Sequence, residues 1–198
     1  MLKRVFDVLL SLVAVVLLSP PLMAIAMLIK LDSRGPLFYK SKRMGKDAIP
    51  FYMYKFRSML NNSSGSKITT RDDKRITRIG RILRKWKMDE LPNLFNVLSG
   101  EMSLVGPRPE VPEYVKKFRK TYNIILKVKP GVTGLSQIKY VNESTHLTTE
   151  CADKEYTNTV LPDKLKLDLE YINKKSFAFD IRIILETFRT ILFGGWNE

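Results

Sequence analysis

The sequence predicts an α+β protein, mainly helical, in which an N-terminal membrane segment precedes a small globular domain. Three observations lead to this fold class. Residues 8–29 contain no charged side chain. The rest of the chain alternates aromatic and basic stretches with segments of helical periodicity. Its 198 residues suffice for one domain with a hydrophobic core. We therefore divide the chain into a membrane helix (residues 1–30) and a globular domain (residues 31–198).

The composition limits the partners and cofactors. A formal net charge of +14 indicates an anionic partner, which could be nucleic acid, an anionic membrane surface or a phosphorylated substrate. The single cysteine, Cys151, excludes an internal disulfide, and with the single histidine, His146, it argues against a transition-metal site. Any metal is therefore expected to be a hard cation, which suggests Mg²⁺ held by carboxylate and phosphate oxygens.

The apolar N-terminal segment is long enough to enter a membrane. At ~1.5 Å per residue, residues 8–29 match a hydrocarbon core of ~30 Å. No small-residue cleavage site follows, as a signal peptide would require, and the segment is apolar on all faces, unlike a soluble surface helix. Ser19, Pro20 and Pro21 predict a kink or a break, and basic residues flank both ends. A kinked span and a re-entrant segment that turns at the prolines both stay open, with the re-entrant form slightly favoured.

The next part of the chain predicts a hairpin and a basic helix. Residues 36–59 are expected to form two short strands with a turn near residues 45–47, and residues 61–66 a flexible loop. Thr77 is placed to cap a helix whose apolar face faces the core. The arginines on its other face, Arg84 among them, are either simply solvated or part of a phosphate-binding surface.

The stretch KWKMDELPNLF, residues 85–95, then places two adjacent carboxylates after the most basic part of the chain. Asp89 stands where a helix N-cap belongs, Glu90 falls in the first turn, and Gly100 is placed to end the helix. Spacing alone supports this structural role of the pair as well as it supports a catalytic one.

Three further segments have a structural and a functional interpretation. Arg108 stands between two prolines, which makes it either a rigid phosphate clamp or an exposed turn residue. The glycines of KPGVTGLSQ, residues 129–137, could direct backbone amides at a phosphate, although a plain turn is favoured. Residues 176–196 predict an amphipathic helix that belongs to the core or lies in a membrane interface.

Taken together, the motifs resemble the bacterial sugar transferase family, the monotopic phosphoglycosyl transferases. In the family's order, and over nearly the whole chain, they are KRVFD, GPLFYKSKRMGK, YKFRSM, RITRIGRILRKWKMDELPNLFNVLSGEMSLVGPRP, KPGVTGLSQ and LDLEYINKKSFAFDIRIILETF. The resemblance implies a re-entrant helix-break-helix anchor that breaks at Ser19 and Pro20. It also implies interfacial amphipathic helices and an active site at the cytoplasmic face of the bacterial inner membrane.

The resemblance further implies an activity. The family transfers a sugar 1-phosphate from a UDP-sugar to a polyprenyl phosphate such as undecaprenyl phosphate, with Mg²⁺, and releases UMP. This reaction starts the assembly of bacterial glycoconjugates such as capsule, exopolysaccharide, O-antigen or glycoprotein glycans. Anionic membrane lipids are expected partners, downstream glycosyltransferases are possible ones, and nucleic acid is not expected. A scaffold that has lost the chemistry is disfavoured because the DELP and GPRP sequences are intact.

The resemblance also implies the site residues. Asp89 is the nucleophile that forms an aspartyl phosphosugar and a ligand of Mg²⁺. Glu90 is a metal partner or a group that positions or deprotonates the acceptor. Gln137 contacts the substrate, and four basic residues contact phosphate or nucleotide: Arg43, Lys55, Arg84 and Arg108. After GLSQ the chain departs from the family pattern, because residues 139–164 are longer and differently composed. That segment is either a specificity loop or a surface excursion, and it leaves the identity of the sugar unassigned.

Overall fold

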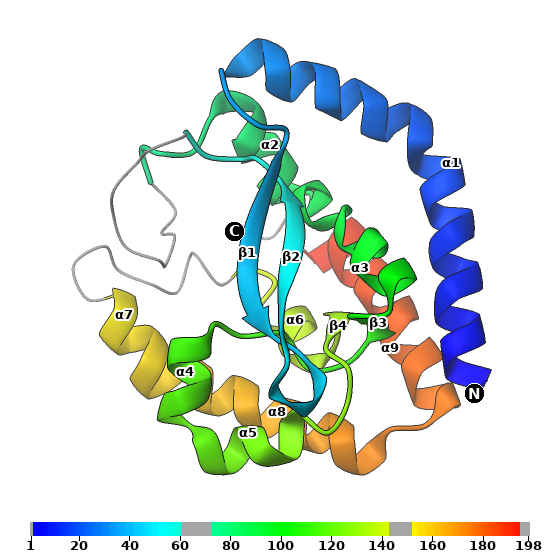
Figure 1. Ribbon diagram of the computed structural model, residues 1–198, viewed down its shortest axis with the longest axis vertical. Coiled ribbons are helices and arrows are strands. Elements are labelled where there is room, and N and C mark those ends of the chain that lie inside the picture. The colour runs from blue at the N-terminus through cyan, green and yellow to red at the C-terminus, as the bar shows by residue number, and fades with distance from the viewer. Residues whose placement is uncertain (1, 61–72, 143–151, 195–198) are drawn as a thin grey trace.

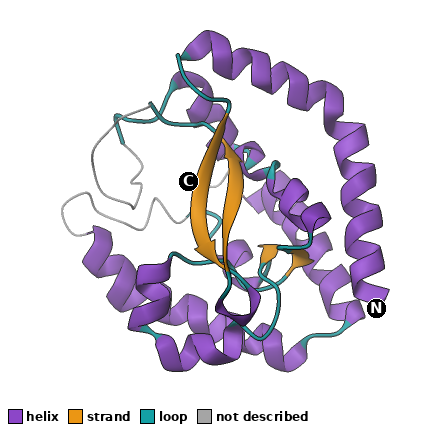
Figure 2. Ribbon diagram, viewed as in Figure 1, coloured by secondary structure: helices purple, strands orange, loops and turns teal. Residues whose placement is uncertain are grey.

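The computed structural model describes residues 2–60, 73–142 and 152–194, and within them it confirms a mainly helical α+β fold. Helices surround two small two-stranded sheets, β1–β2 and β3–β4 (Figure 2). In chain order the elements are α1 (Leu2–Asp32), β1 (Phe38–Met44), β2 (Pro50–Phe56), α2 (Arg78–Lys85), α3 (Asn93–Ser99), β3 (Ser103–Val105), α4 (Pro112–Lys117), α5 (Arg119–Ile125), β4 (Gly131–Thr133), α6 (Leu135–Lys139), α7 (Ala152–Glu155), α8 (Leu161–Lys174) and α9 (Phe177–Arg189).

Helix α1 bends but is not interrupted. It continues through Pro20 and Pro21, and its axis changes direction part-way along, as Figure 1 shows. Pro20 has no amide hydrogen for the carbonyl of Val16, but the hydroxyl of Ser19 donates to that carbonyl at 2.7 Å. The predicted kink is therefore confirmed, whereas the predicted helix-break-helix form is corrected to one bent helix that ends at Asp32.

Both ends of α1 are fixed to the same globular body. Near the N-terminus, Arg4 donates to the carbonyls of Val97 at 2.6 Å and Leu98 at 3.1 Å. Near the other end, Arg57 donates to the carbonyl of Ser33 at 2.5 Å, and the carboxylate of Asp32 accepts from the amide of Ile79 at 3.1 Å. Helix α1 is long and apolar enough to cross a membrane by length and composition, and most of it is exposed.

The hairpin and the basic helix agree with the sequence prediction. Strands β1 and β2 pair antiparallel from Phe38 opposite Phe56 to Met44 opposite Pro50, with a 3₁₀ turn at Lys46–Ala48. Thr77 caps α2, because its hydroxyl accepts from the amide of Gly80 at 2.9 Å. The predicted loop at residues 61–66 lies outside the described residues, as do His146, Cys151 and Trp196.

Two predictions in the middle of the chain are wrong. Asp89 does not cap a helix: it lies in a separate 3₁₀ turn, Met88–Glu90, and α3 begins only at Asn93 with Pro92 at the N-cap position. The predicted turn around Gly131 is instead β4, which pairs parallel with β3. A Cβ on Gly131 would lie 2.1 Å from the amide nitrogen of Gly106, so the close approach of these strands requires glycine. Gly100 ends α3 with a φ of 90°, as predicted.

Three hydrophobic clusters hold the elements together, and Figure 1 shows α1 passing along the outside of this body. The central cluster joins α3, β3, α8 and α9, and a second one joins α4 and α5 to the start of α8. In the second, Tyr156, Val160 and Leu161 are fully buried. Part of the unusual segment 139–164 therefore belongs to the core.

Helix α9 has a buried side and an apolar exposed side. Ser176 caps it by accepting from the amide of Phe179 at 3.2 Å, and Ile183 is buried in the central cluster. Leu185 and Phe188 are more than half exposed on the opposite side. The predicted amphipathic helix is confirmed, and it belongs to the core while leaving an apolar surface uncovered.

Candidate active site

The predicted carboxylate pair lies where four parts of the chain meet. Lys55 comes from the end of β2, Arg84 from the last turn of α2, and Arg108 from the loop after β3. The 3₁₀ turn that carries Asp89 and Glu90 lies between them, directly after α2. Three of the four predicted basic residues therefore surround the predicted carboxylates.

Glu90 is the centre of the ion pairs in this site. Its Oε1 accepts from Nζ of Lys55 at 2.5 Å and from a terminal nitrogen of Arg108 at 3.1 Å. Burial alone would raise the pKa of Glu90, but Lys55 and Arg108 outweigh it and hold that pKa well below its usual range. Glu90 is therefore a permanent anion that holds two cations in place.

Asp89 has the opposite character. Only 7% of its surface is accessible to solvent, and no hydrogen bond joins its carboxylate to another described residue. Burial raises the pKa of Asp89, and the charge of Glu90 raises it further, while Lys55, Arg84 and Lys87 offset part of this effect. The carboxylate is thus more basic than an ordinary aspartate, held among cations, and available to a ligand.

Lys87 is a site residue that the sequence analysis missed. It adopts a left-handed conformation with a φ of 55°, which a non-glycine residue rarely does. Burial lowers the pKa of Lys87, and the charges of Glu90 and Asp89 partly restore it. Its position two residues before Asp89 was a signal, but nothing in the residue types indicated the left-handed backbone conformation of this lysine.

The cations outnumber the carboxylates among the described residues of the site. Arg84 donates from Nε to the hydroxyl of Ser58 at 2.8 Å, and burial lowers its pKa although Asp89 lies close. With Lys55, Lys87 and Arg108 there are four cations around two carboxylates. Such an arrangement has the charge to bind a diphosphate, because the four cations exceed the charge of the two carboxylates.

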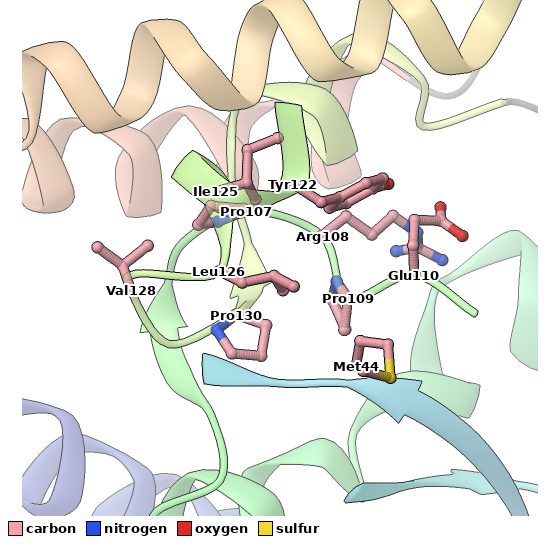
Figure 3. A pocket seen from close by; sticks show the side chains of 10 residues that line it. All are labelled: Met44, Pro107, Arg108, Pro109, Glu110, Tyr122, Ile125, Leu126, Val128 and Pro130. Carbon is pink, nitrogen blue, oxygen red and sulfur yellow. The ribbon is translucent and has the colours of Figure 1, made fainter. Parts of the chain in front are cut away.

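Backbone hydrogen bonds to β4 and α8 fix the loop that carries Arg108. The amide of Gly131 donates to the carbonyl of Pro107 at 2.8 Å, and the backbone amide of Arg108 donates to the buried carboxylate of Asp168. Figure 3 shows the prolines on either side of Arg108 and the nearby ring of Tyr122. The cavity there is only about 10 Å³, so it holds no substrate.

Arg43 and Gln137 are not brought to the carboxylates. Arg43 pairs with Glu110, nitrogen to oxygen, at 3.4 Å. Gln137 donates to the carbonyl of Gly131 at 3.3 Å and accepts from the hydroxyl of Ser136 at 3.0 Å. Their contacts support the loops behind Arg108, and a contact of either residue with substrate stays a prediction.

The carboxylate oxygens of Asp89 are hard donors of the kind that Mg²⁺ prefers. No group of three acidic, histidine or cysteine side chains gathers anywhere in the described parts of the chain. Asp89 offers carboxylate oxygens without a hydrogen-bonding partner there, whereas Oε1 of Glu90 is taken by Lys55 and Arg108. Mg²⁺ commonly binds one or two carboxylates together with substrate phosphates, which this arrangement allows.

Comparison with known proteins decides the family. The model of the family described as bacterial sugar transferase matches residues 1–194. The chain belongs to the bacterial sugar transferase family. The resemblance inferred from the motifs is therefore confirmed over almost the whole sequence.

Three relatives illustrate the match. A UDP-N-acetylgalactosamine-undecaprenyl-phosphate N-acetylgalactosaminephosphotransferase of Aeromonas hydrophila is 39% identical over 97% of this chain and 44% of its own length. A UDP-glucose:undecaprenyl-phosphate glucose-1-phosphate transferase of Escherichia coli is 38% identical over 100% of this chain and 41% of its own. The exopolysaccharide production protein PSS of Rhizobium leguminosarum is 39% identical over 94% and 92%. The chain thus spans less than half of the first two relatives.

Proposed function

We propose that this chain transfers a sugar 1-phosphate from a UDP-sugar to a polyprenyl phosphate such as undecaprenyl phosphate, and so starts the assembly of a bacterial glycoconjugate. The names of the relatives support both substrates. The observation that carries the proposal is a buried carboxylate, Asp89, that has no hydrogen-bonding partner among the described residues and lies within an excess of cations. Phosphoryl transfer requires such charge neutralisation around the attacking group.

In the first step, the cations hold the diphosphate of the donor. Arg84, Lys87 and Arg108 neutralise the phosphate oxygens, so that the carboxylate of Asp89 can approach the β-phosphorus. An oxygen of Asp89 forms a bond to that phosphorus, and the bond from the phosphorus to the bridging oxygen breaks. UMP leaves with the bridging oxygen and its electron pair, and an aspartyl phosphosugar remains.

In the second step, the lipid acceptor takes the phosphosugar from Asp89 and regenerates the enzyme. A phosphate oxygen of the polyprenyl phosphate attacks the same phosphorus, the bond to Asp89 breaks, and a polyprenyl diphosphate sugar forms. The carboxylate of Asp89 is restored. Two successive displacements on one phosphorus replace a direct reaction between two anionic substrates, which would repel each other.

Glu90 acts as a positioning residue in this mechanism. Its low pKa keeps it ionised, so it does not accept a proton from the acceptor, and its contacts at 2.5 and 3.1 Å hold Lys55 and Arg108. Bound Mg²⁺ would neutralise charge on the donor phosphates, and Asp89 is the residue that would hold it.

We also propose that α1 is re-entrant and that the globular body lies at the cytoplasmic face of the inner membrane. The anchoring of both ends of α1 to the same body supports this topology, because a span would place the ends on opposite faces. Between these ends the outward face is apolar and exposed, and anionic lipids would attract the basic body at ~1 kcal/mol per nearby cation. Single cysteines at Leu2 and Leu31, in a Cys151→Ser chain, should be labelled from the same side of sealed vesicles, and labelling from opposite sides would contradict this topology.

The activity is tested with the purified chain in detergent. Undecaprenyl phosphate, Mg²⁺ and each member of a panel of UDP-sugars are combined, and the release of UMP is measured. We expect release with at least one sugar, and none with the Asp89→Asn variant. If no sugar of a broad panel releases UMP, the proposed reaction is wrong for that panel, and a scaffold without chemistry becomes the better interpretation.

A further inference from the structure

An apolar groove lies between the bend of α1 and the globular body. Its volume is about 230 Å³, and its walls come from three places: α1, the paired ends of β1 and β2, and the start of α3. The lining residues include Ser19, Leu22, Ala26, Phe38, Phe56, Pro92 and Phe95. Among the described residues that line the groove, Ser19 alone has a polar side chain, and its hydroxyl already donates to the carbonyl of Val16.

We propose that this groove binds the hydrocarbon chain of the lipid acceptor next to its phosphate. This inference rests on the proposed transfer to polyprenyl phosphate and assigns the site that recognises the chain. The acceptor phosphate must reach the buried Asp89 in the globular body while its tail stays in the bilayer. A bound stretch of hydrocarbon at the site would hold the reacting phosphate in place.

The position of the groove supports this occupant. Phe56 directly follows Lys55, and Pro92 lies two residues after Glu90, so the backbone segments that line the groove are continuous with those that carry the candidate site. Its other wall is the bend of α1, where the groove-lining Met23 and the neighbouring Leu17 are both more than two thirds exposed. The groove therefore connects the apolar surface of α1 with the candidate active site.

The shape of the groove favours one chain with a terminal phosphate. The rings of Phe38 and Phe56 stack with their centroids 5.5 Å apart and their planes 18° apart, and together with Phe95 they offer flat aromatic walls. Such walls suit planar isoprene units, which bury apolar area against aromatic faces. A groove of this volume holds a short stretch of one chain, whereas a membrane phospholipid carries two.

The same substitution at two positions of α1 tests the groove. Ala26→Leu places a larger side chain inside it, and Ala24→Leu makes the same change at an exposed position of α1 outside it. Two rates are compared: turnover with undecaprenyl phosphate, and exchange of labelled UMP into the UDP-sugar, which needs no acceptor. We expect Ala26→Leu to lower the ratio of the first to the second about ten-fold, and Ala24→Leu to leave it unchanged.

A binding measurement separates this inference from the proposed reaction. A diazirine analogue of undecaprenyl phosphate, with the photoreactive group on an isoprene unit near the phosphate, is crosslinked to the full chain in detergent micelles. We expect crosslinks at Leu22, Phe38 or Phe95 that undecaprenyl phosphate suppresses and dioleoyl phosphatidylglycerol does not.

Each outcome has a distinct meaning. Crosslinks elsewhere, or crosslinks suppressed equally by the phospholipid, would overturn the acceptor groove even if UMP exchange proceeds. An equal loss of turnover in Ala26→Leu and Ala24→Leu would overturn it as well. If exchange and turnover are absent from the unchanged protein while the specific crosslinks form, the groove stands and the proposed reaction fails.

Discussion

Two acidic clusters adjoin the Arg108 loop, and they differ in what surrounds them. At Asp89 and Glu90, cations are in excess and one carboxylate lacks a hydrogen-bonding partner among the described residues. At Glu110 and Asp168, hydroxyl and guanidinium donors of the described residues bind the carboxylates. Arg108 belongs to both, because its side chain pairs with Glu90 and its backbone amide donates to Asp168.

The cluster behind the loop is satisfied by the protein itself. Glu110 accepts from the hydroxyl of Tyr156 at 2.5 Å and pairs with Arg43 at 3.4 Å. Asp168 accepts from the hydroxyl of Ser136 at 2.8 Å. The ammonium of Lys164 is buried 4.9 Å from the ring centre of Tyr156. A buried polar network of this kind fixes the backbone around it.

The comparison shows how a catalytic cluster of buried charged residues can be distinguished from a structural one. Both clusters contain carboxylates and cations that burial perturbs, so perturbation alone does not identify the active site. The excess of cations and the available carboxylate distinguish the Asp89 cluster from its neighbour. We interpret the closed cluster as the support that sets the position of Arg108, and the open one as the site that an anionic substrate completes.

The largest effect is expected at the open cluster. Asp89→Asn keeps the size of the side chain but removes the nucleophile, and it should lower turnover on the order of 10⁴-fold while the fold is retained. Asp47→Asn is the matched control, since Asp47 is exposed in the hairpin turn and its positive φ of 57° suits asparagine. UMP release and circular dichroism check both variants. Comparable losses in the two would contradict the assignment.

The next largest effect separates the arginines of the two clusters. Arg108→Lys removes the planar guanidinium that contacts Glu90, and it should lower kcat/KM roughly ten- to a hundred-fold. The same change at Arg43 should affect mainly the Tm, because Arg43 contacts Glu110 in the closed cluster. A larger kinetic effect of Arg43→Lys would favour the phosphate contact that the family resemblance implies for Arg43.

A smaller effect concerns the acid limb of the pH profile. Asp89 must be ionised to attack, and its raised pKa should make turnover fall at a higher pH than the ordinary aspartate value of 3.8 would allow. The charge of Glu90 contributes to that increase, so Glu90→Gln should move the acid limb of the remaining activity to lower pH. A limb that stays in place or moves upward would show that Glu90 does not act on Asp89 in this way.

The smallest effect is a pH dependence of stability from the closed cluster. Burial raises the pKa of Asp168 from 3.8 to about 7. Between these values the folded chain holds a proton that the unfolded chain has lost, so stability falls as pH rises through this window. Above this window the carboxyl of Asp168 is ionised in both states, and the folded state bears the full free-energy cost of burying its charge.

Asp168→Asn tests this effect, because asparagine has no titrating proton and can still accept from Ser136. The Tm of the variant relative to the original chain should increase as pH rises through the window, as followed by tryptophan fluorescence in detergent. A constant difference in Tm would exclude Asp168 as the titrating group.

The sequence was sufficient for features with a local cause. The hairpin, the Thr77 cap and the end of α3 at Gly100 each follow from a few neighbouring residues, and each is confirmed. The parallel pairing of β3 with β4 was not predictable from strand patterns, because each strand has three residues and the partner lies far along the chain. Asp89 was misplaced because a 3₁₀ turn and a helix N-terminus use similar residues.

The site itself was only partly accessible from sequence. Lys55, Arg84 and Arg108 were predicted by resemblance, and the structure brings them around Asp89 and Glu90. Lys87 was missed because its role depends on a left-handed backbone at a lysine. The apolar groove was inaccessible for another reason: its walls come from three separate segments that no short motif links.

The most direct test of the mechanism is the intact mass of the chain after incubation with Mg²⁺ and a UDP-sugar that supports turnover, without lipid acceptor. The two-step reaction predicts a mass increase equal to one sugar phosphate, located on Asp89, and its disappearance when undecaprenyl phosphate is added. An adduct that persists in Asp89→Asn, or rapid turnover with no adduct and no UMP exchange in the unchanged chain, would contradict the aspartyl phosphosugar.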